Sequence, residues 1–259
     1  MHRIAIISDP HANLPALHAV LEDLDKKQPD AVFCLGDLVD FAPWPNEVIE
    51  TIRQRRIPTI MGNHDERIAF DHAILPLEKH TEEERAARVH AIGYTRRTIS
   101  AANREYLSGL PRTVRISYGT GIRARKILLT HASPRSIDEY IYADHPETDL
   151  IWMLQKSDAD VIVMGHTHLP YIRPLITGKF AIDTGSVGRS KEDRISAAYL
   201  MLTIAESQIR PEIVRVAYPV EETIRGIRES AIPDFYANFL AERATSRGAQ
   251  KQRIGQGRL

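Results

Sequence analysis

Short apolar runs rich in Ile, Val and Leu recur along the chain. The first five are Ile4–Ile7, Ala31–Leu35, Thr59–Met61, Lys126–Leu129 and Asp160–Met164. Because these runs are apolar throughout rather than alternating, they are typical of strands buried on both faces. Between the first two runs, leucines three to four residues apart predict an amphipathic helix over Asn13–Leu24. A second helix is expected from Pro45 to about Arg55, and this β-α-β-α-β order predicts an α/β core.

Residues 66–110 have a different pattern, because they are charged and helical in spacing. Thr81 and Ser100 stand where helices would begin, so this segment is expected to form a helical insertion beside the core. Beyond residue 170 further strands are expected, several of them antiparallel because their residues alternate. The three runs that predict them are 180–182, 197–204 and 212–217.

The C-terminal part is expected to be a helix and a tail. A helix is predicted from Glu221 to about Arg228, and the residues after Thr245 include no acid and several basic side chains. Such a composition favours disorder. The chain is therefore divided into a domain over 1–235, including the 66–110 insertion, and a C-terminal segment over 236–259 that ends in a disordered basic tail.

Composition limits the classes of function. The chain has 259 residues, with 34 Lys+Arg against 34 Asp+Glu, so its formal net charge is zero. A general nucleic-acid or membrane binder would need a basic excess, so neither partner is indicated. The single cysteine, Cys34, lies in an apolar run and allows no disulfide within one chain. With no apolar run long enough to span a membrane, the protein is expected to be cytoplasmic.

The strongest functional signal is the set of polar residues that directly follows the five apolar runs. These residues include carboxylate, amide and imidazole groups at the predicted strand ends. They are Asp9 and His11, Asp37 and Asp40, Asn63 and His64, His131, and finally His166 and His168. In an α/β sheet the carboxyl ends of neighbouring strands converge on one crevice. Side chains that are far apart in the sequence are therefore expected to meet in one pocket.

Carboxylate and imidazole groups together suit borderline divalent ions such as manganese, iron, zinc, nickel or cobalt. A structural zinc site built on cysteines is excluded, since there is one cysteine. The candidate metal ligands are Asp9, His11, Asp37, Asn63, His131, His166 and His168. This set is too large for one tetrahedral ion and fits two ions that share a bridging carboxylate. Two such ions stabilise both the attacking and the leaving oxygen of an in-line displacement, which points to phosphoester hydrolysis.

The same residues resemble the calcineurin-like metallophosphoesterases, whose pattern is D-x-H, G-D-x-x-D, G-N-H-[DE], H and G-H-x-H. All five blocks are present in that order. Further segments are similar to a prokaryotic branch of predicted phosphodiesterases in that family, and the likeness covers about residues 1–235. These segments are Gly36–Val39, Pro45–Val48, Thr130–Pro134 and Gly185–Gly188. The resemblance implies a four-layer α/β/β/α sandwich with mixed sheets.

The resemblance also implies a division of roles. Asp9, His11 and His168 would bind one ion, Asn63, His131 and His166 the other, and Asp37 would bridge them. A hydroxide between the two ions would attack the phosphorus of a phosphodiester in line. His64 would protonate the departing oxygen, with Asp40 fixing its tautomer and favouring its protonated form.

The sequence leaves substrate identity open. Asn63, Asn13 and Arg189 are expected to contact a small phosphoester, with nucleotides among the candidates. The loop Phe41–Trp44 departs from the branch pattern, although Trp44 itself is interpreted as a packing residue rather than a stacking platform. Two alternatives stay open: a phosphomonoesterase or protein phosphatase, and a scaffold of the same fold without metals. The oligomeric state is not predicted.

Overall fold

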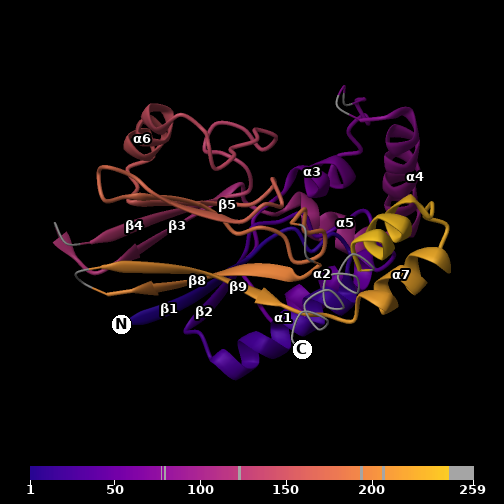
Figure 1. The fold of residues 1–259 in the computed structure, drawn as a ribbon, viewed down its shortest axis with the longest axis horizontal. Coiled ribbons are helices and arrows are strands. Elements are labelled where there is room, and N and C mark those ends of the chain that lie inside the picture. The colour runs from indigo at the N-terminus through magenta and orange to yellow at the C-terminus, as the bar shows by residue number, and fades with distance from the viewer. Residues whose placement is uncertain (77, 79, 122–123, 193–194, 206–207, 245–259) are drawn as a thin grey trace, which may run out of the picture.

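The computed structural model describes residues 1–76, 78, 80–121, 124–192, 195–205 and 208–244. Its strands form two mixed sheets (Figure 1). The first sheet has the order β2-β1-β8-β9, made of β1 (His2–Ile7), β2 (Ala31–Cys34), β8 (Ala197–Ile204) and β9 (Ile209–Val216). The second has the order β3-β4-β5-β7-β6, made of β3 (Thr113–Tyr118), β4 (Arg125–Thr130), β5 (Val161–Met164), β6 (Tyr171–Pro174) and β7 (Phe180–Asp183).

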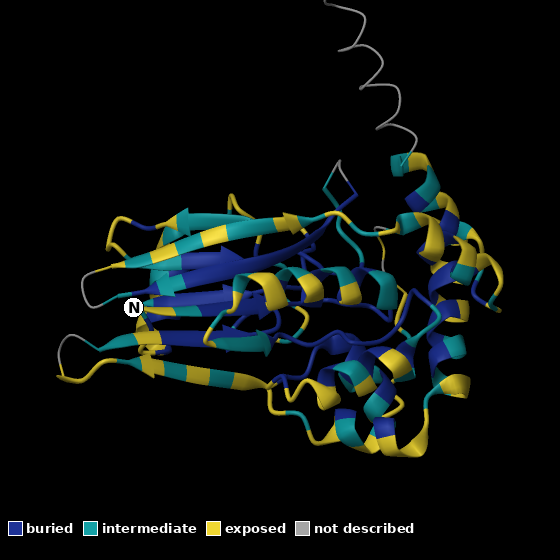
Figure 2. Cartoon of the chain, turned by 90° about the horizontal axis from the view of Figure 1, so that it is seen from below, coloured by how far each residue is buried: buried dark blue, intermediate teal, exposed yellow. Residues whose placement is uncertain are grey.

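The two sheets pack face to face through an apolar layer. Ile4 and Ile6 of β1 meet Ile127 and Leu129 of β4 in this layer. The runs that the sequence shows as wholly apolar are buried on both sides because their other faces pack against helices. Figure 2 shows the inner strands as mainly buried, whereas the outer strands alternate between intermediate and exposed residues. About 0.8 kcal/mol of stabilisation accompanies each buried CH₂ group, so this layer is a major source of stability.

Helices cover the outer faces of the sandwich. On one side α1 (Leu14–Lys27) and α2 (Pro45–Gln54) pack on the first sheet, and Leu17, Leu21 and Ile49 belong to that core. On the other side α6 (Glu147–Lys156) packs on the second sheet through Leu150 and Leu154. The arrangement is the expected four-layer α/β/β/α sandwich with mixed sheets, because β1 and β2 pair in parallel while β8 and β9 run antiparallel.

Some expected elements differ from the structure. The run Thr59–Met61 is not a strand of either sheet and makes a single parallel bridge, between Cys34 and Thr59. This segment is short, and Pro58 at its start has no backbone N–H to donate to a ladder. Three elements had no counterpart in the sequence interpretation, namely β3, β6 and α6.

The segment expected to be a helical insertion forms α3 (Asn63–Ala69), α4 (Glu82–Thr98) and α5 (Ala101–Ser108). The side chains of Thr81 and Ser100 accept hydrogen bonds from backbone N–H groups three residues later, so both cap their helices as expected. These helices gather with α7 (Val220–Arg228) at one end of the sandwich, on the right in Figure 1.

Further helical residues follow α7 at the C-terminal end of the described chain. Residues 235–244 are helical, and Tyr236, Ala237 and Leu240 are buried against Phe41 and Ile224. This run therefore packs as part of the same unit, and Tyr236 reaches the cavity described below. The basic tail over 245–259 lies outside the described residues. No helix among the described residues has the length and apolar character needed to cross a bilayer.

A close contact between Trp44 and α7 supports a stability prediction. A Cβ atom on Gly226 would lie 2.3 Å from the indole of Trp44, whereas one on Gly93 of α4 would lie 3.2 Å from the flexible end of Arg97. We expect Gly226→Ala to lower the free energy of unfolding by about 1–3 kcal/mol, the usual cost of overpacking. Gly93→Ala is the matched control and should raise it by up to about 1 kcal/mol through helix propensity. Urea titration of both variants measures the difference, and equal effects would contradict the packing role of Trp44.

Candidate metal centre

The metal-ligand candidates lie in loops whose backbone adopts an unusual conformation. Asp9, His11, Asp37, His166 and His168 all have positive φ angles, between 46° and 68°. Such a conformation costs of order 1–3 kcal/mol per non-glycine residue and persists only where the surrounding structure imposes it. Here the loops after β1 and β2 are tied together, because the backbone N–H of His11 donates to the carbonyl of Asp37 at 2.9 Å. The fold therefore holds these residues in a strained backbone conformation in which their side chains point toward one another.

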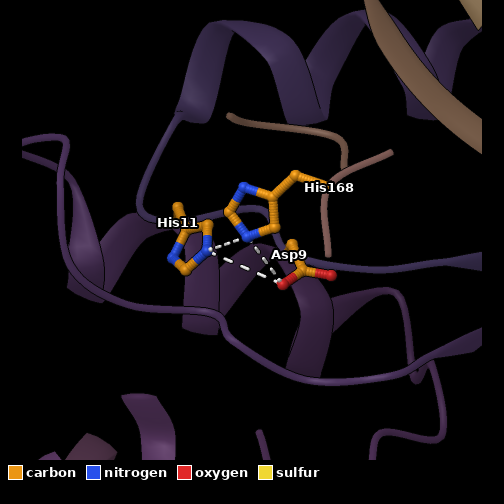
Figure 3. A group of neighbouring side chains, drawn as sticks. All are labelled: Asp9, His11 and His168. Atoms are coloured by element: carbon orange, nitrogen blue, oxygen red, sulfur yellow. Dashed lines mark hydrogen bonds and ion pairs between the residues drawn. The ribbon is translucent and has the colours of Figure 1, made fainter. Parts of the chain in front are cut away.

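The first ligand cluster is formed by Asp9, His11 and His168 (Figure 3). All three side chains are buried. Nε2 of His11 lies 3.1 Å from Nε2 of His168, and Asp9 Oδ1 lies 3.2 Å from the same atom of His168. The far nitrogens of the two rings face backbone carbonyls, at 2.9 Å from Val39 and 2.7 Å from Arg189.

These contacts fix the tautomers. A carbonyl oxygen accepts hydrogen bonds only, so Nδ1 of each ring carries the proton and each Nε2 presents a lone pair. Burial lowers the pKa of His11 and that of His168, which leaves both rings neutral. Two lone pairs and a carboxylate oxygen thus converge with no proton between them. This arrangement is repulsive in itself and fits a bound cation at the point of convergence.

The second cluster combines Asp37, His131 and His166, with Asn63 beside them. The amide oxygen of Asn63 lies 3.1 Å from Nε2 of His131 and 3.1 Å from Nδ1 of His166. Nε2 of His166 is buried and has no hydrogen-bond partner among the described residues. Burial opposes a charge on His131, yet the carboxylates of Asp37 and Asp9 raise its pKa to about 10. The cluster therefore attracts positive charge, which a metal ion would supply.

Asp37 lies between the two clusters. Its Oδ2 atom is 3.7 Å from Nε2 of His11 and 3.4 Å from Nε2 of His131. Burial disfavours ionisation of this carboxyl, but His131 and His64 lower its pKa well below the usual value. An ionised carboxylate within reach of both ligand sets is suited to bridge two ions.

Two neighbours hold Asp37 in place. A Cβ atom on Gly62 would lie 2.1 Å from Asp37 Oδ1, so only glycine allows this close approach. Asp65 accepts hydrogen bonds from the backbone N–H groups of Asp37, Leu38 and Gly62, at 2.7, 2.8 and 3.0 Å. Asp65 therefore stabilises both the loop that contains Asp37 and the start of α3.

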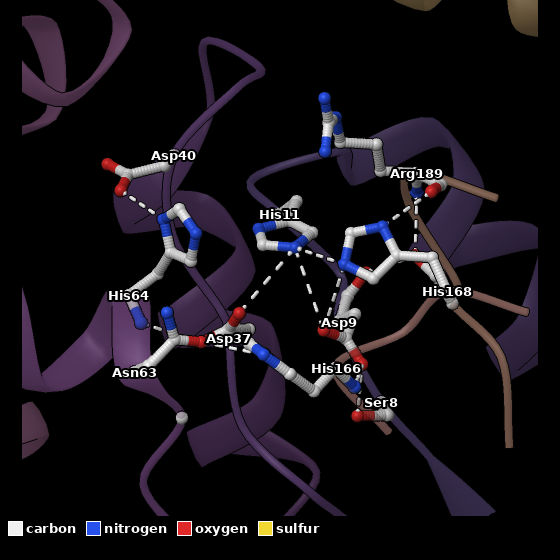
Figure 4. Close-up of polar contacts among 12 residues, drawn as sticks. Ser8, Asp9, His11, Asp37, Asp40, Asn63, His64, His166, His168 and Arg189 are labelled. Atoms are coloured by element: carbon white, nitrogen blue, oxygen red, sulfur yellow. Dashed lines mark hydrogen bonds and ion pairs between the residues drawn. The ribbon is translucent and has the colours of Figure 1, made fainter. Parts of the chain in front are cut away.

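His64 and Asp40 form a buried pair next to Asp37 (Figure 4). Nδ1 of His64 lies 2.6 Å from Asp40 Oδ2, and the backbone N–H of His64 donates to Asp37 Oδ1 at 2.8 Å. Burial raises the pKa of Asp40 to about 6. Burial also lowers the pKa of His64 well below 6.5, and the nearby Arg67 adds to this effect. The sequence interpretation expected Asp40 to favour protonated His64, and in the structure burial acts in the opposite direction.

Two residues expected to contact substrate have other partners. Asn13 is buried, accepts a hydrogen bond from the backbone N–H of Ala16 as a helix cap, and donates to the carbonyl of Gly188. These hydrogen bonds give Asn13 a structural role at the start of α1. Arg189 lines the cavity, and its guanidinium lies 4.1 Å from the ring centre of Phe41. Its carbonyl also holds His168, as Figure 4 shows.

A cavity of about 560 Å³ opens beside the clusters. Its wall includes Asp37, Asn63, His64, His166 and His168, together with residues that carried no signal in the sequence. The unexpected wall residues include Arg67, Arg88, Tyr140, Lys191 and Tyr236. Tyr140 has its ring centre 4.1 Å from that of His166. These residues belong to no block of the pattern, so only the folded chain shows that they share a wall.

Comparison with known proteins shows relatives that match most of the chain. The chain is 30% identical over 253 residues to the uncharacterized protein MJ0912 of Methanocaldococcus jannaschii, covering 92% of this chain and 96% of that protein. It is similar to the crystal structure of a metallophosphoesterase from Sphaerobacter thermophilus, with a TM-score of 0.71, 29% identity and coverage of 93% and 98%. The hypothetical protein PH1004 of Pyrococcus horikoshii shares the fold, with a TM-score of 0.78, 22% identity and the same coverage.

A family model described as calcineurin-like phosphoesterase matches residues 2–170. That range contains every residue of the two ligand clusters, together with His64 and Asp40. The match agrees with the order of the five polar blocks and with the four layers of the fold. The chain belongs to the calcineurin-like phosphoesterase family.

Proposed function

We propose that the protein is a phosphodiesterase that uses two divalent metal ions. The observation that carries this proposal is the convergence of the Nε2 lone pairs of His11 and His168 at 3.1 Å, beside the carboxylate of Asp9. A hydrogen bond cannot join two lone pairs, and a metal ion can. The second cluster gives further support, since it combines an amide oxygen, a carboxylate and two imidazoles at one point.

The ligands divide between two ions. Asp9, His11 and His168 would hold the first ion, Asn63, His131 and His166 the second, and Asp37 would reach both. This mixture of nitrogen and oxygen donors suits manganese, iron, zinc, nickel or cobalt. When bound, two such ions supply Lewis acidity at the phosphoryl oxygens and a water that ionises near neutral pH.

The protein side chains would position the substrate and move one proton. His64 lies in the cavity wall, where burial lowers its pKa. The negative charge of a bound phosphoester would raise that pKa, so that Nε2 would take up a proton and pass it to the departing oxygen while Asp40 orients the ring through Nδ1. Arg189 and the amide of Asn63 would contact the remaining phosphate oxygens. A small phosphodiester is favoured over a monoester by the resemblance of Gly36–Val39 and Gly185–Gly188 to the phosphodiesterase branch.

Metal analysis and a pair of substrates test this proposal. We expect purified protein to hold about two equivalents of transition metal and to hydrolyse bis(p-nitrophenyl) phosphate faster than p-nitrophenyl phosphate. EDTA should abolish the activity, and manganese should restore it. Calcium should not, because it prefers shells made of oxygen ligands. Faster hydrolysis of the monoester would identify a phosphomonoesterase instead. Protein without stoichiometric metal that leaves both esters intact would be a scaffold.

A further inference from the structure

Two arginines lie beside His64 in the wall of the cavity. Arg67 stands three residues after His64 on α3, so the two side chains share one face of that helix. Arg88 comes from α4 and has only 8% of its surface exposed. Both line the cavity together with His64, whose pKa is lowered by burial and further by the charge of each arginine. The helical insertion thus places the guanidinium group of Arg88 near that of Arg67.

Neither arginine forms an ion pair among the residues that the structure describes. Arg88 donates from Nη1 to the carbonyl of Leu75 at 2.8 Å. Nη1 of Arg67 is buried and, within the described part of the chain, has no hydrogen-bond partner. Burial lowers the pKa of Arg88, and the repulsion between its charge and that of Arg67 lowers it further. Holding two like charges together, one on a buried side chain and one on a half-buried side chain, is costly unless an anion compensates them.

Three of the acidic groups nearby, Glu66, Glu84 and Asp40, have other partners. Glu66 pairs with Arg112, and Glu84 lies 3.4 Å from Nε2 of His80. Asp40 attracts both arginines, but one of its oxygens is hydrogen-bonded to His64 at 2.6 Å. Asp138 lines the cavity near Tyr140. Asp138 is not among the charges that act most strongly on Arg88, and the single carboxylate of Asp40, shared with a histidine, does not neutralise two guanidinium groups, so the part of the wall around Arg67 and Arg88 has an excess of positive charge.

We infer that Arg67 and Arg88 form an anion subsite for a second phosphate on the leaving group of the substrate. This inference rests on the proposed function, because His64 defines the leaving-group side. Guanidinium groups match phosphate oxygens in geometry and charge. The cavity volume of about 560 Å³ lies within the range of sites for small organic ligands. The substrate class is therefore a phosphodiester or phosphoanhydride whose leaving group carries a further phosphate.

Two non-reacting probes test the subsite directly. They are AMP, with one phosphate, and adenosine 5′-(α,β-methylene)diphosphate, whose P–C–P bridge resists hydrolysis. Calorimetry with manganese-loaded protein should show about tenfold or tighter binding of the second probe, as expected for one added charge-assisted contact. In Arg67→Ala and in Arg88→Ala the ratio of the two dissociation constants, that of AMP over that of the methylene diphosphate, should fall to about twofold or less. The matched control is Arg97→Ala, an exposed arginine on the same helix as Arg88, and it should keep the wild-type ratio.

Conservative variants keep the test informative if an alanine variant folds poorly. Arg67→Lys and Arg88→Lys retain the charge and should give intermediate ratios. Equal affinity of the wild-type protein for both probes would overturn the inference, as would an unchanged ratio in both alanine variants. Hydrolysis of bis(p-nitrophenyl) phosphate is measured in parallel, because that diester has no second phosphate. If the protein hydrolyses it while the probes bind equally, the subsite is wrong and the proposed function stands. If the affinity ratio is about tenfold in the wild-type protein and falls in the alanine variants, but the diester is not hydrolysed, the proposed function alone fails.

Discussion

Asp37→Asn is expected to lower kcat on bis(p-nitrophenyl) phosphate by about a thousandfold or more, and to reduce the metal content below two equivalents. Loss of a single preorganised electrostatic group typically costs a hundredfold to a thousandfold, and Asp37 serves both clusters. Its Oδ2 atom lies 3.7 Å from His11 Nε2 and 3.4 Å from His131 Nε2. An amide has the same shape but no negative charge, so it bridges two cations poorly. The expected loss therefore comes from the charge rather than from the space that the side chain fills.

The control for Asp37→Asn is Asp25→Asn, the same chemical change at a surface ion pair. Asp25 pairs with Arg55 at 2.7 Å, and about half of each side chain is exposed. Exposed pairs contribute about 0–1 kcal/mol, so Asp25→Asn should keep both ions and full activity. Inductively coupled plasma mass spectrometry and initial rates measure the two quantities together. Two bound ions and near-normal rates in Asp37→Asn would refute the bridging role.

The clustering of the ligand candidates could be predicted because strand ends are visible in the sequence. Each ligand candidate follows a short apolar run, and the carboxyl ends of β1, β2, β4 and β5 meet at one edge of the sandwich. The ligand candidates come from two sheets that face each other, and periodicity alone does not assign the strands to one sheet or the other. The run before Asn63 is not a strand, yet Asn63 arrives at the same place because the backbone N–H of Ile60 donates to the carbonyl of Cys34.

The cavity wall could not be predicted in the same way. Arg88 reaches the site only because α4 packs through Ala87 and Ala91 onto the cluster that holds Phe41 and Tyr236. Helical spacing in the sequence predicts which face of α4 is buried, but it does not predict which residues that face packs against. Asn13 also follows a strand, and its side chain caps α1, a role that the position after a strand does not by itself reveal. Local patterns define ligands near strand ends, and long-range packing decides which side chains meet the substrate.

His64→Asn is expected to lower kcat by about a hundredfold to ten-thousandfold on esters with poor leaving groups, the usual range for a general acid. The two metal ions should remain, because the His64 ring contributes to neither ligand cluster. His64 lies in the cavity wall and is held at Nδ1 by Asp40, 2.6 Å away. Asp40→Asn should give a smaller loss of about tenfold to a hundredfold, since orienting partners typically contribute that much. His90→Asn, at an exposed position on α4, is the matched control and should leave kcat unchanged.

The dependence on the leaving group separates acid catalysis by His64 from a purely structural role. p-Nitrophenolate departs without a proton, whereas an alkyl alkoxide needs one, so the loss in His64→Asn should be small for the nitrophenyl diester and large for an alkyl diester. Initial rates on a series of diesters with increasing leaving-group pKa measure the slope of this dependence, which should be steeper in His64→Asn than in the wild-type protein. Parallel slopes with a uniform loss would show that His64 positions the backbone near Asp37, to which its N–H donates at 2.8 Å, rather than supplying the proton.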